Sequence, residues 1–222
     1  MKTFSIAIDG PAGAGKSTIA KKLANLLQCI YIDTGAMYRS VGYYCLTNGI
    51  ALEDEQAVSA ALAHIEITLK HTSEGQRIFL NGEDVSEKIR TAEGSAAASK
   101  VATYGQVRAA MVERQQEMAK STSIIMDGRD IGTVVLPFAT LKIFLTASVE
   151  ERAMRRFKEY QEKGMSCDLE ALKSEISLRD KQDSEREISP LKKADDAIEL
   201  DTTHMQIDEI VENIKALLEE RL

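Results

Sequence analysis

The sequence lacks the marks of a membrane-bound or secreted protein and of a protein that holds a metal in a cage of cysteines and histidines. No apolar run approaches the roughly 18 residues that a membrane-spanning helix needs, and the N-terminus leads straight into a predicted strand rather than into a signal peptide. The three cysteines form no C-x-x-C pair and the three histidines do not cluster, so the residues of a metal cage are missing. We therefore expect a cytoplasmic protein that has no membrane partner.

Positive charge is also in short supply. Lysine and arginine total 28 against 35 aspartates and glutamates, which leaves a net charge of −7. This balance argues against a surface that coats nucleic acid, although it leaves room for a local basic cleft. The 222 residues suffice for one α/β domain with a small inserted lobe. Because the chain is acidic, we expect it to bind no nucleic acid, and because it has no coiled-coil heptad, we expect a monomer.

What the chain does contain is a complete phosphate-binding motif. Residues 10–17 read Gly-Pro-Ala-Gly-Ala-Gly-Lys-Ser and match G-x-x-x-x-G-K-[ST], between the apolar run 4–8 and the helical pattern 17–28. Glycines let main-chain N–H groups turn inward around a phosphate, and the helix that follows adds its positive end. Lys16 would reach the β- and γ-phosphates and Ser17 would hold Mg²⁺. The motif predicts a nucleoside triphosphate but no particular reaction, because kinases, GTPases, motors and sensors share it.

Strand and helix patterns alternate along the chain, which predicts a parallel sheet with helices on both faces. Residues 63–91 break this rhythm, because Ile65 to Lys70 alternates with a period of two and Asn81-Gly82 is a hairpin signal. This segment is predicted to form a small antiparallel sheet, either a functional insert or a decorative hairpin. The expected strands are 4–8, 29–33, 124–127, 141–147 and 197–201, and the expected helices are 17–28, 35–47, 97–119, 149–163, 168–184 and 206–220.

Arginines follow predicted strands in this acidic chain. Arg39 comes after the segment 33–38, and Arg129 lies in Asp-Gly-Arg-Asp directly after the strand 124–127. Guanidinium groups grip phosphates in a bidentate manner and neutralise charge on transferring oxygens. Any single arginine could instead form a surface salt bridge, but the places of Arg39 and Arg129 favour phosphate contacts.

The reaction is narrowed by motifs that the chain does not have. No Asn-Lys-x-Asp motif reads guanine, which argues against a GTPase, and no H-R-D loop with D-F-G is present, which excludes a protein kinase. No dedicated general base is evident. Transfer to an alcohol needs a group that accepts the proton, whereas a phosphate monoester is already ionised near pH 7. The pattern favours a phosphate acceptor, unless Asp33 or Asp127 serves as a base.

Several segments together resemble bacterial cytidylate (CMP) kinase. They are residues 8–18, 33–39 (Asp-Thr-Gly-Ala-Met-Tyr-Arg), 127–135 (Asp-Gly-Arg-Asp-Ile-Gly-Thr-Val-Val), 152–156 and 179–190. The resemblance implies an α/β P-loop kinase core with a five-stranded parallel sheet, a small insert that binds the nucleoside monophosphate, and a short lid. The core would comprise residues 1–62 and 92–222, the insert residues 63–91 and the lid about 150–166.

The same resemblance implies that ATP, with Mg²⁺ at Ser17, donates its γ-phosphate to CMP or dCMP and yields CDP or dCDP. The residues expected to cradle ATP are Gly10, Pro11, Ala12, Gly13, Ala14, Gly15, Lys16, Ser17 and Thr18. Thr34, Arg39, Arg129 and Arg186 would hold the acceptor phosphate, Ser99, Arg108 and Asp130 would read cytosine, and Arg179 and Asp183 would contact the sugar. The expected catalytic residues are Lys16, Arg129, Arg186 and two lid arginines, Arg152 and Arg156, which would close on the transferring phosphoryl group.

Three alternatives stay open on the sequence alone. Asp130 can accept a hydrogen bond from the cytosine N4 amino group while Arg108 donates to N3 and O2, but Asp130 could also merely orient Arg129. The chain could be another P-loop small-molecule kinase, of the shikimate or adenylate type, although the Asp-Gly-Arg-Asp segment and the insert disfavour this. It could also be a non-catalytic nucleotide sensor or an assembly ATPase, which would not need so many arginines.

Overall fold

The computed structural model describes residues 3–72, 75–120, 122–162 and 164–222. The chain divides into two compact units, of which the first comprises Met1–Ile30 and Thr122–Leu222 and the second comprises Tyr31–Ser121. Among the described residues, no helix is both long and apolar enough to cross a membrane.

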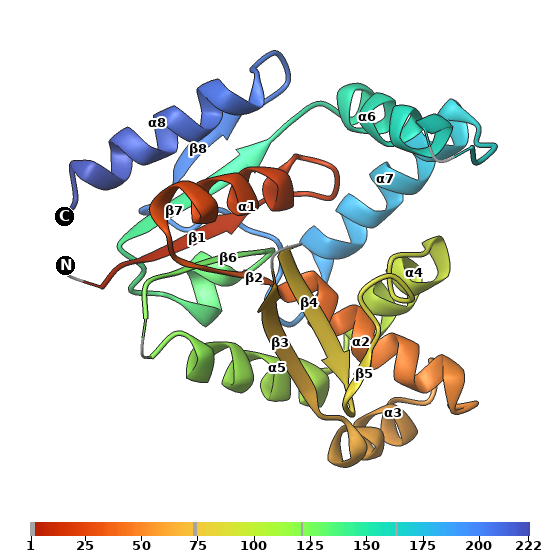
Figure 1. The fold of residues 1–222 in the computed structure, drawn as a ribbon. Coiled ribbons are helices and arrows are strands. Elements are labelled where there is room, and N and C mark those ends of the chain that lie inside the picture. The colour runs from red at the N-terminus through yellow and green to blue at the C-terminus, as the bar shows by residue number, and fades with distance from the viewer. Residues whose placement is uncertain (1–2, 73–74, 121, 163) are drawn as a thin grey trace. The chain divides into compact units, whose positions relative to one another are not determined.

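A five-stranded parallel sheet is the centre of the fold (Figure 1), as the sequence predicts. Its strand order is β2-β6-β1-β7-β8, so the first strand of the chain lies in the middle. Ile6, Ala7 and Ile8 of this strand are fully buried, because a central parallel strand is covered on both faces. The strands are β1 (Ser5–Asp9), β2 (Ile30–Asp33), β6 (Ile124–Gly128), β7 (Leu141–Thr146) and β8 (Ile198–Asp201).

Helices of the first unit cover this sheet and extend beyond it. Helix α1 (Lys16–Leu27) packs against α8 (Ile207–Glu219) and against the sheet. Helices α6 (Val149–Glu162) and α7 (Leu169–Glu185) pack against each other as a hairpin. The hairpin encloses an apolar cluster of its own, made of Ala153, Leu172 and Ile176 with Val149, Phe157, Tyr160, Cys167 and Leu169. The predicted lid 150–166 falls on α6 and the turn after it, and residue 163 lies outside the described residues.

The second unit contains the small antiparallel sheet that the sequence predicts. Its strands are β3 (Ile67–Thr72), β4 (Gly75–Leu80) and β5 (Glu83–Asp84), in that order. Asn81 and Gly82 join β4 to β5 with φ angles of 50° and 84°, the left-handed values that a two-residue hairpin turn requires. Residues 73 and 74 of the predicted insert lie outside the described residues, and the insert boundaries 63–91 stay a prediction. The helices of this unit are α2 (Thr34–Thr47), α3 (Glu55–Ala61), α4 (Ala92–Val101) and α5 (Gly105–Met118), with a short turn η1 (Leu62–His64).

The prediction of one helix over residues 97–119 is wrong, because two helices, α4 and α5, occupy this stretch. Helix α4 begins five residues earlier, where Thr91 Oγ1 accepts a hydrogen bond of 2.9 Å from the N–H of Gly94. It ends where the N–H groups of Thr103 and Tyr104 bond back to carbonyls three residues earlier. The sequence analysis also did not predict α3 or the short helical turn η2 (Ile131–Val135) that follows β6.

Candidate active site

The P-loop joins β1 to α1, and its first residue can only be glycine. The φ of Gly10 is 145°, and a Cβ there would lie 2.1 Å from the carbonyl oxygen of Leu145 on β7. Gly15 stands at the N-cap of α1 with φ at 87°, and since it has no side chain, the N–H groups of the first turn can point at a ligand. The Lys16 ammonium donates a hydrogen bond of 2.7 Å to the carbonyl oxygen of Pro11. This is the cradle that a triphosphate needs.

We expect Gly10→Ala to abolish measurable ATP binding, because a Cβ so close to a main-chain oxygen forces the loop or β7 to move. Isothermal titration with ATP measures the effect. Gly49→Ala is the matched control, since Gly49 also has a positive φ of 66° but a Cβ there meets nothing within 4 Å. The control should keep its ATP affinity and lose only about 1 kcal/mol of stability. Wild-type affinity in Gly10→Ala would contradict this account of the loop.

Lys16 is buried in a positively charged environment. The pKa of Lys16 is lowered to about 7, first by burial and then by the charges of Arg129 and Arg179, against the opposing charges of Asp127 and Asp183. All of these groups belong to the first unit. An ammonium so close to losing its proton is stabilised strongly by an incoming anion. The site is therefore built to receive negative charge.

Binding of ATP should be accompanied by proton uptake. At pH 8 a lysine with a pKa of about 7 is mostly neutral, and a bound triphosphate favours its charged form and so raises its pKa. We expect an uptake approaching one proton per ATP, measured by calorimetry in two buffers that differ in ionisation enthalpy. In Lys16→Arg this uptake should vanish, because a guanidinium is protonated throughout. An uptake that Lys16→Arg retains in full would assign the proton to another group.

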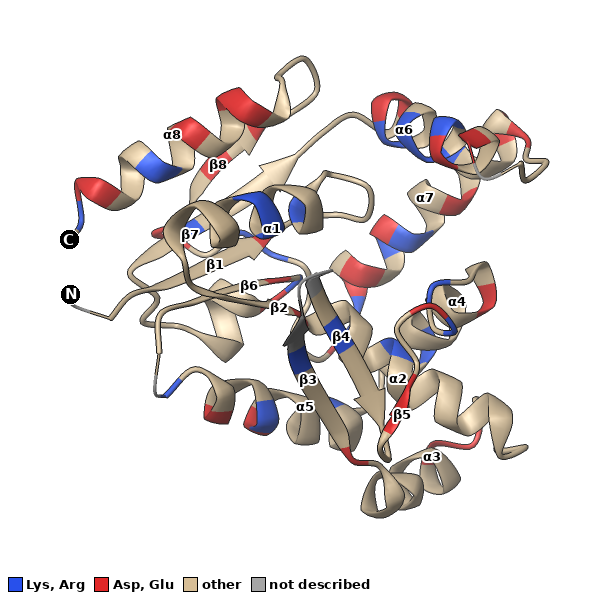
Figure 2. Ribbon diagram, in the orientation of Figure 1, with Lys and Arg blue, Asp and Glu red and all other residues tan. Residues whose placement is uncertain are grey.

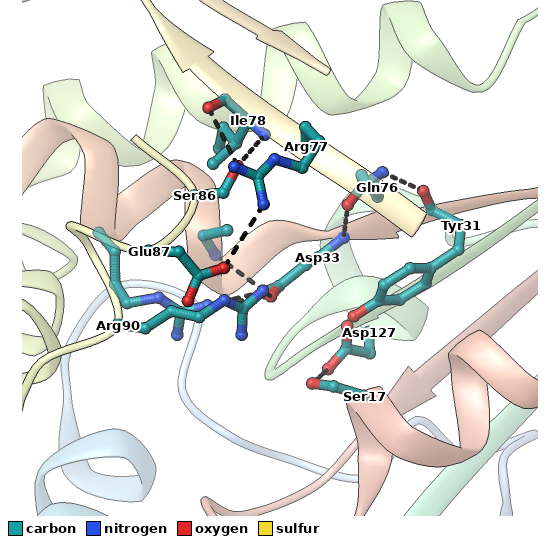
Figure 3. A network of polar contacts seen from close by, with 12 residues as sticks. Ser17, Tyr31, Asp33, Gln76, Arg77, Ile78, Ser86, Glu87, Arg90 and Asp127 are labelled. Atoms are coloured by element: carbon teal, nitrogen blue, oxygen red, sulfur yellow. Dashed lines mark hydrogen bonds and ion pairs between the residues drawn. The ribbon is translucent and has the colours of Figure 1, made fainter. Parts of the chain in front are cut away.

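Ser17 and Asp127 lie together beside the P-loop (Figure 3). Ser17 Oγ donates a hydrogen bond of 2.9 Å to Asp127 Oδ2 at the end of β6. A hydroxyl and a carboxylate are oxygen ligands of the kind that Mg²⁺ prefers, with its remaining ligands taken from water and phosphate. The pair fits a Mg²⁺ ion. Sequence reasoning considered Asp127 only as a base, although its place at the end of a strand was the available signal.

Helix α7 carries positively and negatively charged residues along its length (Figure 2), and its last turns contain Arg179, Asp180 and Asp183. Arg129 Nε donates a hydrogen bond of 2.8 Å to Asp183 Oδ2. Two nitrogens of Arg186 lie 3.8 Å from Asp183 Oδ1 and 3.9 Å from Asp130 Oδ1. Burial raises the pKa of Asp183, but the charge and hydrogen bond of Arg129, together with Arg179 and Arg186, hold it below its ordinary value. The first unit thus contains five of the nine residues predicted for the acceptor, namely Arg129, Asp130, Arg179, Asp183 and Arg186.

The two predicted lid arginines have different surroundings. Arg152 is 4% exposed, and it donates to the P-loop carbonyl of Ala12 at 3.0 Å and to Asp180 Oδ2 on α7 at 2.6 Å. In this conformation Arg152 is therefore part of the wall of the P-loop. Arg156 lies further along α6, where its NH1 is 3.2 Å from Glu175 Oε1. Closure of either side chain on a phosphoryl group stays a prediction.

In the second unit, Asp33 lies at the centre of a polar network (Figure 3). Its side chain caps α2 and accepts a hydrogen bond of 3.0 Å from Arg39, and Arg90 NH2 lies 3.5 Å from the same carboxylate. Gln76 on β4 accepts a hydrogen bond of 3.3 Å from the Asp33 N–H and also contacts the carbonyl of Tyr31. Sequence reasoning missed Arg90 and Gln76, because neither belongs to a recognisable motif.

Arg108 and Ser99 belong to the same unit. The Arg108 guanidinium is 3% exposed and lies 5.5 Å from the centre of the Tyr38 ring, within the range of a cation–π contact. Helices α2 and α4 approach so closely that a Cβ on Gly42 would lie 2.7 Å from Ala97 Cβ. Ser99 is half-buried on α4. The second unit therefore contains Thr34, Arg39, Ser99 and Arg108, and the first contains Arg129, Asp130, Arg179, Asp183 and Arg186.

Solved structures with a similar fold include a shikimate kinase from Acinetobacter baumannii. This chain aligns with it at a TM-score of 0.50 and 14% identity, over 99% of this chain and 94% of that one. At this identity the likeness shows the fold alone, a P-loop kinase fold, and does not bear on the acceptor.

Comparison with sequence families is more specific. A family model described as cytidylate kinase matches residues 6–220. A cytidylate kinase of Bacillus cytotoxicus is 55% identical over 221 residues, which cover 100% of this chain and 98% of the relative. Another, from Geobacillus sp., is 55% identical over 217 residues, which cover 98% of this chain and 97% of the relative. With a match that spans nearly its whole length, the chain belongs to the cytidylate kinase family.

Proposed function

We propose that this chain catalyses the transfer of the γ-phosphoryl group of ATP to CMP and dCMP, giving ADP with CDP or dCDP. Membership of the family supports the phosphotransferase activity and a phosphate group as the acceptor. The observation that carries the mechanism is the buried side chain of Lys16. Its pKa is lowered to about 7, chiefly by burial and by the charges of Arg129 and Arg179. Such a group gains most when a triphosphate and a second anion arrive together.

The P-loop holds the donor. Its N–H groups and Lys16 grip the β- and γ-phosphates, and the P-O bond between them breaks as an acceptor phosphate oxygen attacks the γ-phosphorus. Ser17 and Asp127 would hold Mg²⁺, which supplies charge neutralisation on the phosphate oxygens when bound. The negative charge that develops on the transferring group faces Arg129 and Lys16, whose positions are fixed beforehand by Asp183 and Pro11.

No general base is required for this acceptor, because a nucleoside monophosphate is largely ionised near pH 7 and has no proton to give up. Arg129 and Arg186 of the first unit hold the acceptor phosphate, since guanidinium groups match its geometry, and the contacts of Thr34 and Arg39 with it stay predictions from the sequence. Asp130 accepts from the cytosine amino group. A uracil carbonyl at the same place would face a carboxylate, which is unfavourable. The monomeric state and the cytoplasmic location stay predictions from the sequence.

A panel of acceptors tests the proposal. ADP formation is measured with MgATP and each of CMP, dCMP, UMP, AMP and shikimate in turn. CMP and dCMP should stimulate turnover most, and UMP should follow well behind. Preference for AMP or shikimate would assign the chain to another acceptor class. Slow ATP turnover that no monophosphate changes would favour a nucleotide sensor.

A further inference from the structure

The helical turn η2 receives its cap from a distant strand. Its first two N–H groups, those of Ile131 and Gly132, donate to the two carboxylate oxygens of Asp9 at 2.8 and 2.7 Å. Asp9 is the last residue of β1 and lies 122 residues before Ile131. Only 5% of Asp9 is exposed, so water cannot replace these two bonds if they are lost.

The residue whose position would ordinarily make it the cap of this turn is Asp130. It stands at the N-cap of η2, and aspartate is among the best capping residues because its carboxylate accepts from the N–H groups two or three positions on. The structure describes every residue of this turn, and within it the Asp130 side chain makes no capping hydrogen bond. Asp130 Oδ1 instead lies 3.9 Å from Arg186 NH2. Asp9 therefore caps the turn, and the Asp130 carboxylate faces Arg186.

Two further observations agree with Asp9, and not Asp130, being the cap of η2. Gly132 allows the close approach, because a Cβ there would lie 3.3 Å from Asp9 Oδ2 and 3.2 Å from Lys142 Cδ. Burial raises the pKa of Asp9 to about 6, while the two N–H donors favour its charged form. The cap is therefore mostly ionised at pH 7 and above.

We propose that Asp9 is a positioning residue for recognition of the acceptor base: by capping η2 in place of Asp130, it keeps the Asp130 carboxylate beside Arg186, where it can face cytosine. This inference rests on the proposed function of Asp130. When Asp9 is lost, the buried N–H groups of Ile131 and Gly132 lose their acceptor, and Asp130 stands two positions before Gly132, where an N-cap side chain accepts. Asp130 then turns back onto its own turn and no longer reads the base.

A double-mutant cycle tests the coupling. The values of kcat/KM for CMP and for UMP are measured for wild type, Asp9→Asn, Asp130→Ala and the double variant. Asp9→Asn keeps the size of the side chain but loses one of the two accepting oxygens, and we expect it to lower the CMP-to-UMP ratio about 10-fold, as displaced positioning contacts do. In the Asp130→Ala background the same change should leave the ratio unaltered, because no carboxylate is left to be withdrawn. Additive losses, or an unchanged ratio in Asp9→Asn, would overturn the inference.

Two variants guard against a general loss of folding. Asp54→Asn is the matched control, since Asp54 Oδ1 accepts a hydrogen bond of 2.9 Å from the N–H of Ala57 and caps α3; it should keep the CMP-to-UMP ratio. Gly132→Ala presses on the Asp9 contact without altering the carboxylate, and it should shift the ratio in the same direction as Asp9→Asn. It therefore keeps the test decisive if Asp9→Asn does not fold.

Amide hydrogen exchange supplies a readout that needs no substrate. The N–H group of Gly132 should stay protected in Asp9→Asn, where Asp130 takes over as the cap, and lose protection in the double variant with Asp130→Ala. Equal protection in the two variants would overturn the inference even if CMP were not the acceptor. A wild-type enzyme without CMP-dependent turnover would instead count against the proposed function.

Discussion

Lys16→Ala should lower kcat/KM for MgATP and CMP by about 10³-fold, the loss typical of removing one preorganised donor to a developing charge. The Lys16 ammonium is held at 2.7 Å by the Pro11 carbonyl, in a buried site that Arg129 and Arg179 make more positive. Its charge is worth most when the γ-phosphoryl group is in transit, so kcat should fall more than KM rises. Steady-state kinetics with both substrates varied gives the two parameters separately.

Lys21→Ala provides the matched control for Lys16. Lys21 is an exposed lysine on the same helix, and its loss should leave kcat/KM within twofold of wild type, as about 0.5 kcal/mol or less is expected for such surface changes. Lys16→Arg keeps a positive charge but in a wider, planar group, and it should recover only part of the rate. Full activity in Lys16→Ala would remove this residue from the reaction.

Arg129→Ala should damage both activity and folding stability. Without its guanidinium, the buried Asp183 carboxylate loses its 2.8 Å partner, and breaking such a pair from one side costs roughly 3–5 kcal/mol. The acceptor phosphate also loses a ligand, so kcat/KM for CMP should fall about 10²-fold. Urea unfolding measures the first effect and the coupled ADP assay the second.

The double variant Arg129→Ala with Asp183→Asn separates these two effects. Neutral asparagine leaves no unpaired charge, so most of the lost stability should return while activity stays low.

The pH dependence of folding stability offers a further check on Asp183. Its pKa is lowered in the folded state, so its carboxylate stabilises the fold above the ordinary aspartate pKa, and this contribution is lost as pH falls through the folded value. The stability difference between wild type and Asp183→Asn should therefore shrink between pH 6 and pH 3. A constant difference would contradict the ion pair.

The features predicted correctly from the sequence are those encoded within a few residues. The P-loop needs only Gly10 to Ser17, and the turn between β4 and β5 needs only Asn81 and Gly82, whose positive φ angles follow from their residue types. The buried strand β1 is evident from its continuous apolar run. Each of these predictions depends on local geometry alone, and the fold class follows from their order.

What the sequence could not reveal depends on partners far along the chain. Arg152 stands on a charge-rich helix that suggests a solvated face, yet its partners are Ala12, 140 residues away, and Asp180 on the next helix. The bonds of Asp9 to Ile131 and Gly132 are equally remote. At the break between α4 and α5 the only glycine is Gly105, the first residue of α5, and a single glycine also stands inside a helix, as Gly42 does in α2, so this signal does not decide where a helix ends.

The apolar cluster inside the α6–α7 hairpin limits how this part of the chain can move. Ala153 on one helix and Leu172 and Ile176 on the other shield each other from water. Separating the two helices would therefore expose apolar surface, at a cost of about 25 cal/mol for every Å². Any movement that brings Arg156 nearer to a nucleotide must therefore move both helices together as one rigid body. The pivot of this movement would lie near the start of α6, where Arg152 donates a hydrogen bond to the P-loop carbonyl of Ala12.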